Sequence, residues 1–170
     1  RLTPLTSRGY VNIAAQYRLA GVAKWPSQME DVKASIRWTR ANAAKLGIEP
    51  ARIALAGYSA GGHLALFGAA TANRPEFEGK GGNAGVGTDV AACLAYYAVT
   101  GGQAWEGFRR QFPMPEGSSE EAWRLATPGT YITSFPPTAL FHGLADTTVR
   151  PESSQDFLTQ LRDAKIPLVD

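Results

Sequence analysis

The chain has 170 residues, a formal net charge of +2, and 44% hydrophobic against 19% charged residues. This length and balance are typical of one folded globular domain with a real core. The basic residues are scattered, without a run that would grip phosphates, so nothing favours nucleic-acid binding. No apolar stretch approaches the roughly 20 residues that a membrane helix needs.

The first part of the chain predicts strands and helices in alternation. Residues 9–17 form a short apolar run that predicts a buried strand. A helix is expected from Ser27, where Glu30 completes a capping box, to Gly47, which suits a helix C-terminus. Residues 52–57 predict an inner parallel strand that closes on a glycine, and a second helix is expected over residues 60–71.

The alternation continues after a glycine-rich loop at residues 73–89. The elements expected there are a strand at 90–98, a short helix near 119–126, a strand at 138–142, a helix at 151–164 and the start of a strand at 166–169. Such alternation predicts an α/β fold, with a mostly parallel sheet and helices on both faces, as a single domain over residues 1–170.

Residues 100–136 are rich in Gly, Pro and aromatic side chains and predict a long insertion, like a lid or a pocket wall. Aromatic rings in such a segment suit an acyl or alcohol pocket, or they pack the insertion onto the sheet. The rings concerned are those of Trp105, Phe108, Phe112, Trp123 and Tyr131.

The segment Gly57-Tyr58-Ser59-Ala60-Gly61 matches Gly-x-Ser-x-Gly, between the expected strand and the expected helix. In this context the serine sits on a strained turn that pushes its hydroxyl out at the top of the sheet, as a nucleophile requires. The N–H of Ala60 is then placed as an oxyanion donor at the helix N-terminus. The alternative is a tight strand-to-helix turn with an idle serine.

Several blocks together resemble the bacterial carboxylesterases of the α/β-hydrolase fold, the group of hormone-sensitive-lipase-like and feruloyl- or acetyl-esterase-like enzymes. The blocks are Trp25-Pro26 through Asp31-Val32, Arg37-Trp38, Asn42-Ala43, residues 47–53, residues 57–65, Ala126-Thr127-Pro128 with Thr130-Tyr131, Pro136-Pro137, and His142-Gly143-x-x-Asp146-x-x-Val149. The resemblance covers nearly all of the chain. It implies hydrolysis of small carboxylic esters through an acyl-enzyme, without a cofactor.

The resemblance implies that Asp146 is the acid of a catalytic triad. The chain pattern agrees, because Asp146 follows a predicted strand and sites form beyond the carboxyl ends of parallel strands. A turn cap is the alternative role for this aspartate, since Asp146-Thr147-Thr148 favours a turn.

The base is harder to assign, because the chain holds two histidines. The resemblance places a His-Gly-Gly oxyanion loop before residue 9 and the catalytic histidine after the strand that follows the acid. The chain has neither, so it is expected to be the middle of a hydrolase trimmed at both ends. His142 and His63 are the possible bases within the chain, with His142 the stronger candidate. In the family, however, His142 supports the loop that holds the acid and His63 packs.

Other functions remain open at this stage. The motif does not distinguish leaving groups, so an amidase, formamidase or peptidase is an alternative, as is a catalytically silent fragment or binding module. No zinc-ligand spacing and no phosphate-binding loop are present, so no metal is expected. The single cysteine, Cys93, lies in an apolar run and is expected to be a buried structural thiol. Exposed sheet edges would favour a homodimer.

Overall fold

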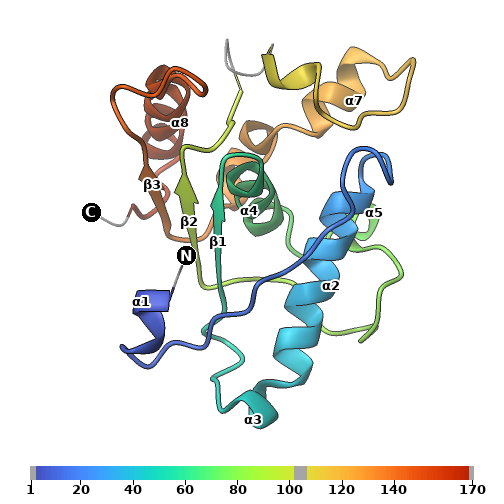
Figure 1. The fold of residues 1–170 in the computed structure, drawn as a ribbon, viewed down its shortest axis with the longest axis vertical. Coiled ribbons are helices and arrows are strands. Elements are labelled where there is room, and N and C mark those ends of the chain that lie inside the picture. Colours follow the sequence, from blue (N-terminus) through green and yellow to red (C-terminus); the bar gives the residue numbers. More distant parts are fainter. Residues whose placement is uncertain (1–2, 102–106, 169–170) are drawn as a thin grey trace.

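The computed structural model describes residues 3–101 and 107–168. Three parallel strands form one sheet in the order β1-β2-β3, which places β2 at its centre (Figure 1). Their bounds are β1 Ala54–Tyr58, β2 Ala92–Tyr96 and β3 Thr138–Phe141. In the pairing register Tyr58 lies beside Tyr96, and Tyr96 lies beside Phe141, so the three strands end level with one another. The α/β fold is thereby confirmed.

Helices follow or precede each strand. They are α1 Thr3–Thr6, α2 Ser27–Ala41, α3 Ala43–Leu46, α4 Ala60–Ala70, α5 Pro75–Glu78, α7 Glu120–Leu125, the 3-10 helix η1 Pro128–Ser134, and α8 Pro151–Asp163. The helices predicted at 60–71, 119–126 and 151–164 are therefore confirmed. Within the described residues no helix has the length and apolar character needed to span a membrane.

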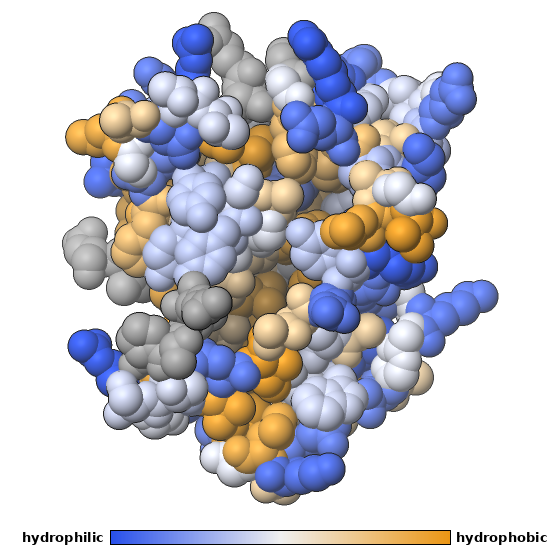
Figure 2. Space-filling model, in the orientation of Figure 1, coloured by the Kyte–Doolittle hydropathy of each residue, from blue (hydrophilic) through white to orange (hydrophobic). Residues whose placement is uncertain are grey.

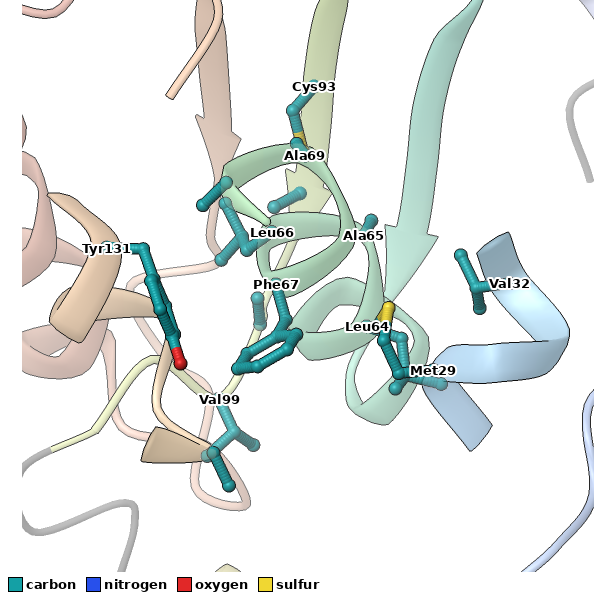
Figure 3. Packing of buried hydrophobic residues seen from close by; sticks show 14 of the residues in the cluster. Met29, Val32, Leu64, Ala65, Leu66, Phe67, Ala69, Cys93, Val99 and Tyr131 are labelled. Carbon is teal, nitrogen blue, oxygen red and sulfur yellow. The ribbon is translucent and has the colours of Figure 1, made fainter. Parts of the chain in front are cut away.

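Helix α4 is the centre of the hydrophobic core, and its residues 62–70 are all buried. Figure 3 shows Met29 and Val32 of α2 on one side of this helix and Tyr131 of η1 on the other. Phe67 is fully buried and meets the Tyr131 ring edge-on at a centroid distance of 5.4 Å. The core therefore fixes the helix that begins at the Gly-x-Ser-x-Gly motif.

The opposite face of the sheet is open at β1. Ala54, Ala56 and Tyr58 are exposed, whereas Leu55 and Gly57, which alternate with them, are half-buried and buried. Alternate residues of a strand point to opposite faces, so one face of β1 packs on α4 and the other meets solvent. Figure 2 shows a hollow with apolar colouring in the middle of the face drawn in Figure 1.

The strand predicted at residues 9–17 is wrong. This segment has no regular secondary structure, and Tyr10 and Ile13 are 58% and 41% exposed. A strand is stabilised by a hydrogen-bonded neighbour, and no ladder joins this segment to the sheet within the described residues. At its end the Arg18 side chain pairs instead with Asp31 of α2, at 2.9 Å.

The first predicted helix is confirmed in place but differs in detail. It breaks at Asn42 into α2 and α3, and it begins at Ser27 with Pro26 as the cap residue, so the expected capping box does not form. Gly47 does end the helical run, in the left-handed conformation at φ 65°. Near the C-terminus, Leu168 makes an isolated bridge to Thr138 rather than a strand, and Val169 lies outside the described residues.

Candidate active site

Ser59 occupies a strained turn between β1 and α4. Its backbone has φ 51° and ψ −118°, a conformation that a residue with a side chain rarely adopts. The Ser59 N–H donates to the Tyr96 carbonyl at 3.0 Å, and the Ser59 carbonyl accepts from the His63 N–H at 3.0 Å. The turn is thus held by β2 on one side and by the first turn of α4 on the other.

Two glycines allow this turn to pack closely. A Cβ on Gly57 would overlap the backbone of Gly61, and a Cβ on Gly62 would lie 2.8 Å from the Cβ of Ala98. Gly61 itself has open space around its Cα. The first glycine of the motif therefore makes room for the backbone of the second.

Ala60 is the first residue of α4, directly after Ser59. The N–H groups in the first turn of a helix have no acceptor within the helix, and the helix dipole makes this end favourable for negative charge. The Ala60 N–H can therefore donate to an oxyanion that forms on an acyl group at Ser59.

His63 lies one turn into α4 and is fully buried. Its Nδ1 lies 3.1 Å from the Val99 carbonyl oxygen, so Nδ1 carries the proton and donates. Burial lowers the pKa of His63 to about 4. This neutral imidazole links the segment after β2 to α4, in agreement with the packing role expected for it.

Asp146 lies in the loop that follows β3, at the same edge of the sheet as Ser59. Its Oδ1 accepts from the N–H groups of Thr148 at 2.8 Å and Val149 at 3.0 Å. These two hydrogen bonds, together with nearby His142, hold the pKa of the Asp146 carboxyl below its ordinary value. Asp146 therefore caps the turn, which is the alternative role considered for it, and it does so through Oδ1 alone.

His142 has a side chain that is only 7% exposed. Its Nε2 lies 2.8 Å from the Val149 carbonyl oxygen and its Nδ1 lies 2.7 Å from the Ser154 Oγ. The distance from Nε2 to Asp146 Oδ2 is 3.6 Å, which is long for a hydrogen bond. Both ring nitrogens are engaged, Nε2 by the loop that contains Asp146 and Nδ1 by α8, an arrangement that favours a supporting role over that of the base.

The sequence-predicted residues fall into two groups. Ser59 and Ala60 form one group after β1, and His142 and Asp146 form the other after β3, with β2 between them. Neighbouring strands lie about 4.8 Å apart, so the groups sit about two strand spacings apart on one sheet edge.

A ring stack at this edge escaped the sequence reasoning. Tyr58 and Tyr96 stack at a centroid distance of 4.7 Å, and Tyr96 and Phe141 at 4.5 Å. Each ring belongs to the last residue of its strand. The sequence therefore held a signal for this stack, because an aromatic residue ends each of the three apolar runs. The stack lies on the open face of the sheet, where Phe141 is 44% exposed.

The aromatic residues of the predicted insertion are mainly core. Phe112 and Tyr131 are buried, and Phe108 and Trp123 pack against the core while partly exposed. Trp105 lies outside the described residues. Packing onto the core is thus the role that the structure gives to the two buried rings.

Cys93 is buried, as expected, and burial raises the pKa of its thiol to about 12. Within residues 3–101 and 107–168, no cluster of three or more His, Cys, Asp or Glu side chains is placed to hold a metal ion.

Comparisons with known proteins place these features among esterases. The BD-FAE family model matches residues 2–161. Two proteins of Mycobacterium tuberculosis are similar: Esterase LipC is 32% identical over 95% of this chain and 42% of its own length, and the probable carboxylic ester hydrolase LipM is 30% identical over 99% of this chain and 41% of its own. The chain spans about two fifths of the length of these curated relatives.

Solved structures of esterases are also similar to this chain. The Thermogutta terrifontis esterase 2, phosphorylated by paraoxon, superposes with a TM-score of 0.79 at 28% identity, over 98% of this chain and 60% of its own. A truncated carbohydrate esterase from gut microbiota superposes with a TM-score of 0.76 at 26% identity, over 91% of this chain and 62% of its own.

Proposed function

The chain belongs to the BD-FAE family, and on that basis we propose that it carries the nucleophile and the acid of a serine esterase that cleaves small carboxylic esters. Ser59 is the nucleophile, Ala60 supplies one oxyanion donor, and Asp146 is the acid. The observation that carries the proposal is the backbone conformation of Ser59, at φ 51°, between β1 and α4. Hydrogen bonds to Tyr96 and His63 hold this turn.

The reaction proceeds in two halves. The Ser59 Oγ bonds to the ester carbonyl carbon while a histidine takes the hydroxyl proton, and the negative oxygen is held by the Ala60 N–H. The C–O bond to the alcohol then breaks, and the alcohol leaves with that proton. Water attacks the acyl-enzyme by the same route and releases the carboxylic acid, which restores Ser59.

The base in this scheme is a histidine outside these 170 residues. The chain has two histidines; His63 is buried with its Nδ1 on a backbone carbonyl, and both nitrogens of His142 are engaged. Asp146 Oδ2 is not taken by the two backbone N–H groups that bind Oδ1, so it is placed to accept from the Nδ1–H of that further histidine.

The test is hydrolysis of p-nitrophenyl acetate and butyrate by the 170-residue chain, with and without added imidazole. Imidazole substitutes for a missing base, so we expect it to raise the rate of the wild type well above that of Ser59→Ala at the same imidazole concentration. Ser118→Ala, a change at a half-buried loop serine whose hydroxyl donates to the Pro115 carbonyl, should match the wild type. Equal rates for wild type and Ser59→Ala under both conditions would refute the esterase proposal.

The same assay addresses the leaving group. Anilides with the matched acyl groups measure amidase activity, and faster Ser59-dependent cleavage of an anilide than of its ester would replace the esterase proposal by an amidase.

We also propose that a second copy of the chain is a partner. The support is the outer edge of β1, which no other strand covers within the described residues, and uncovered edges invite pairing.

A further inference from the structure

The first turn of α8 carries two adjacent serines that are both buried, at 7% exposure each. Their side chains reach different loops. The Ser153 Oγ lies 2.7 Å from the Thr100 Oγ1, in the segment after β2, and the Ser154 Oγ lies 2.7 Å from the His142 Nδ1, in the segment after β3. One helix turn therefore contacts both loops at the edge of the sheet where Ser59 and Asp146 lie.

The acceptor at His142 Nε2 decides the direction of the Ser154 bond. The Val149 carbonyl can only accept, so Nε2 carries a proton and donates to it at 2.8 Å. In the neutral ring Nδ1 is then a lone pair, and it accepts from the Ser154 hydroxyl. The Val149 carbonyl thus selects the Nε2–H tautomer of His142, and the Ser154 hydroxyl stabilises this tautomer by donating to Nδ1.

In this tautomer, hydrogen bonds through Val149 join His142 to Asp146 within the loop that follows β3. Val149 receives the His142 proton at its carbonyl and donates its own N–H to Asp146 Oδ1 at 3.0 Å. The orientation of the Asp146 carboxylate therefore depends on His142 through Val149. The second oxygen, Oδ2, stays 3.6 Å from Nε2 and outside hydrogen-bond range of it.

The hydrogen bond between Ser153 and Thr100 connects α8 to the segment after β2, on the side of the sheet edge where Ser59 lies. The Thr100 hydroxyl donates to the Ser153 carbonyl at 2.8 Å, so the Ser153 hydroxyl donates to Thr100 Oγ1 in return. Next to Thr100, the Val99 carbonyl accepts from His63, which lies one turn after Ser59 in α4. A series of buried and part-buried hydrogen bonds, joined through the backbone at Val99–Thr100 and Ser153–Ser154, therefore runs from α4 to the loop that contains Asp146.

We propose that Ser153 and Ser154 are positioning residues for the acid. Ser154 orients Asp146 by stabilising the Nε2–H tautomer of His142, and Ser153 links the His142 loop through Thr100 to the turn that holds Ser59. The inference rests on the proposed function in that Asp146 is the acid. Neither serine touches the reacting atoms.

The first experiment is NMR on the 170-residue chain, with ¹⁵N-labelled imidazole rings and ¹³C-labelled carboxyl groups. With two histidines the spectrum has an internal reference, because His63 holds its proton on Nδ1 and His142 on Nε2. In Ser154→Ala we expect His142 to become a mixture of tautomers and the pKa of Asp146 to rise toward its ordinary value. Ser154→Thr, which keeps the hydroxyl, should retain the wild-type tautomer and the lowered pKa of Asp146.

Thr159→Val is the matched control, because Thr159 is an exposed hydroxyl of the same helix that bonds only to Gln155 one turn back. It should leave the His142 tautomer and the Asp146 pKa unchanged. The same pKa of Asp146 in Ser154→Ala as in the wild type would overturn the proposal for Ser154.

The second experiment measures imidazole-assisted ester hydrolysis at Ser59. Ser154→Ala and Thr100→Val should each lower kcat about tenfold with KM unchanged, since small displacements of positioned groups cost one to two orders of magnitude. An unchanged kcat in Thr100→Val would overturn the proposed link from Ser153 to the turn that holds Ser59. If Ser59→Ala does not lower the rate, the proposed function fails, while the tautomer and the Asp146 pKa still decide whether Ser154 positions the carboxylate.

Discussion

Gly57 makes room for the sharp turn that lifts Ser59 out of the sheet. A Cβ at this position would overlap the Gly61 backbone and lie 2.8 Å from the Gly62 nitrogen. Because the obstacle is backbone rather than a flexible side chain, we expect Gly57→Ala to lower the free energy of unfolding by about 2–3 kcal/mol. Urea denaturation measures it.

Gly61→Ala is the matched control within the same motif. Nothing lies within 4 Å of a Cβ added there, and the residue is inside α4. Replacing a helical glycine by alanine stabilises a helix by about 1 kcal/mol, so this variant should be as stable as the wild type or more so. Equal losses of stability in the two variants would show that the close approach at Gly57 does not set the turn.

Local motifs explain which site residues could be predicted. Ser59 and Asp146 were predicted because each belongs to a short pattern that ends a strand. Ser153 was not, because its partner Thr100 lies 53 residues away and the pairing exists only after the sheet has formed. The engagement of both His142 nitrogens was equally hidden, since one of its partners, Ser154, belongs to the following helix.

Helix α4 has a buried cation at the end opposite to Ser59. The Lys33 side chain of α2 is fully buried, and its Nζ donates to the Gly68 carbonyl at 2.9 Å and to the Thr71 carbonyl at 2.7 Å. A positive charge at a helix C-terminus is favourable, but burial opposes it. Burial lowers the pKa of Lys33 from 10.5 to about 8, although Glu78 lies 4.0 Å away.

The lowered pKa predicts how this anchor responds to pH. Because the unfolded chain binds the lysine proton more tightly than the folded one, the contribution of Lys33 to stability rises as the pH passes from 8 toward 10.5. Between pH 7 and pH 9 we expect the wild type to gain about 1 kcal/mol relative to Lys33→Met in denaturant unfolding.

The control for this measurement is Lys45→Met, since Lys45 is exposed on α3. The stability difference between this variant and the wild type should not change with pH. If Lys33→Met behaves in the same way, the pKa of Lys33 is not lowered in the folded protein.

A secondary-structure element could be predicted where a single chain segment makes all of its own backbone hydrogen bonds. The helix at 60–71 was predicted because every backbone bond of a helix is internal. Residues 9–17 were predicted as a strand from their apolar run, but the structure gives them no regular secondary structure and does not include them in the sheet. A strand needs a neighbour, and an apolar run does not say whether one is present.

At the scale of the whole molecule, the sheet is asymmetric in its edges. Beyond β3, Thr138 donates its N–H to the Pro167 carbonyl and bridges to Leu168, whereas β1 has no strand beside its outer edge within the described residues. The parallel order of the strands followed from their alternation with helices, but which edge stays open depends on contacts between distant segments. The hollow in Figure 2 has apolar colouring, which suits association.

The open edge of β1 leads to the last prediction, which concerns self-association. Two copies related by a twofold axis can pair their β1 strands edge to edge, so that each edge satisfies the other. Light scattering should therefore report a mass of twice 18.2 kDa. Ala56→Lys places a charge on the exposed side of this strand and should give a monomer, whereas Ala51→Lys, with the same charge in the exposed turn before β1, should remain a dimer. A wild-type mass of 18.2 kDa at all concentrations, or a dimer that persists in Ala56→Lys, would contradict pairing through β1, because a lysine on an edge strand blocks the approach of a second strand.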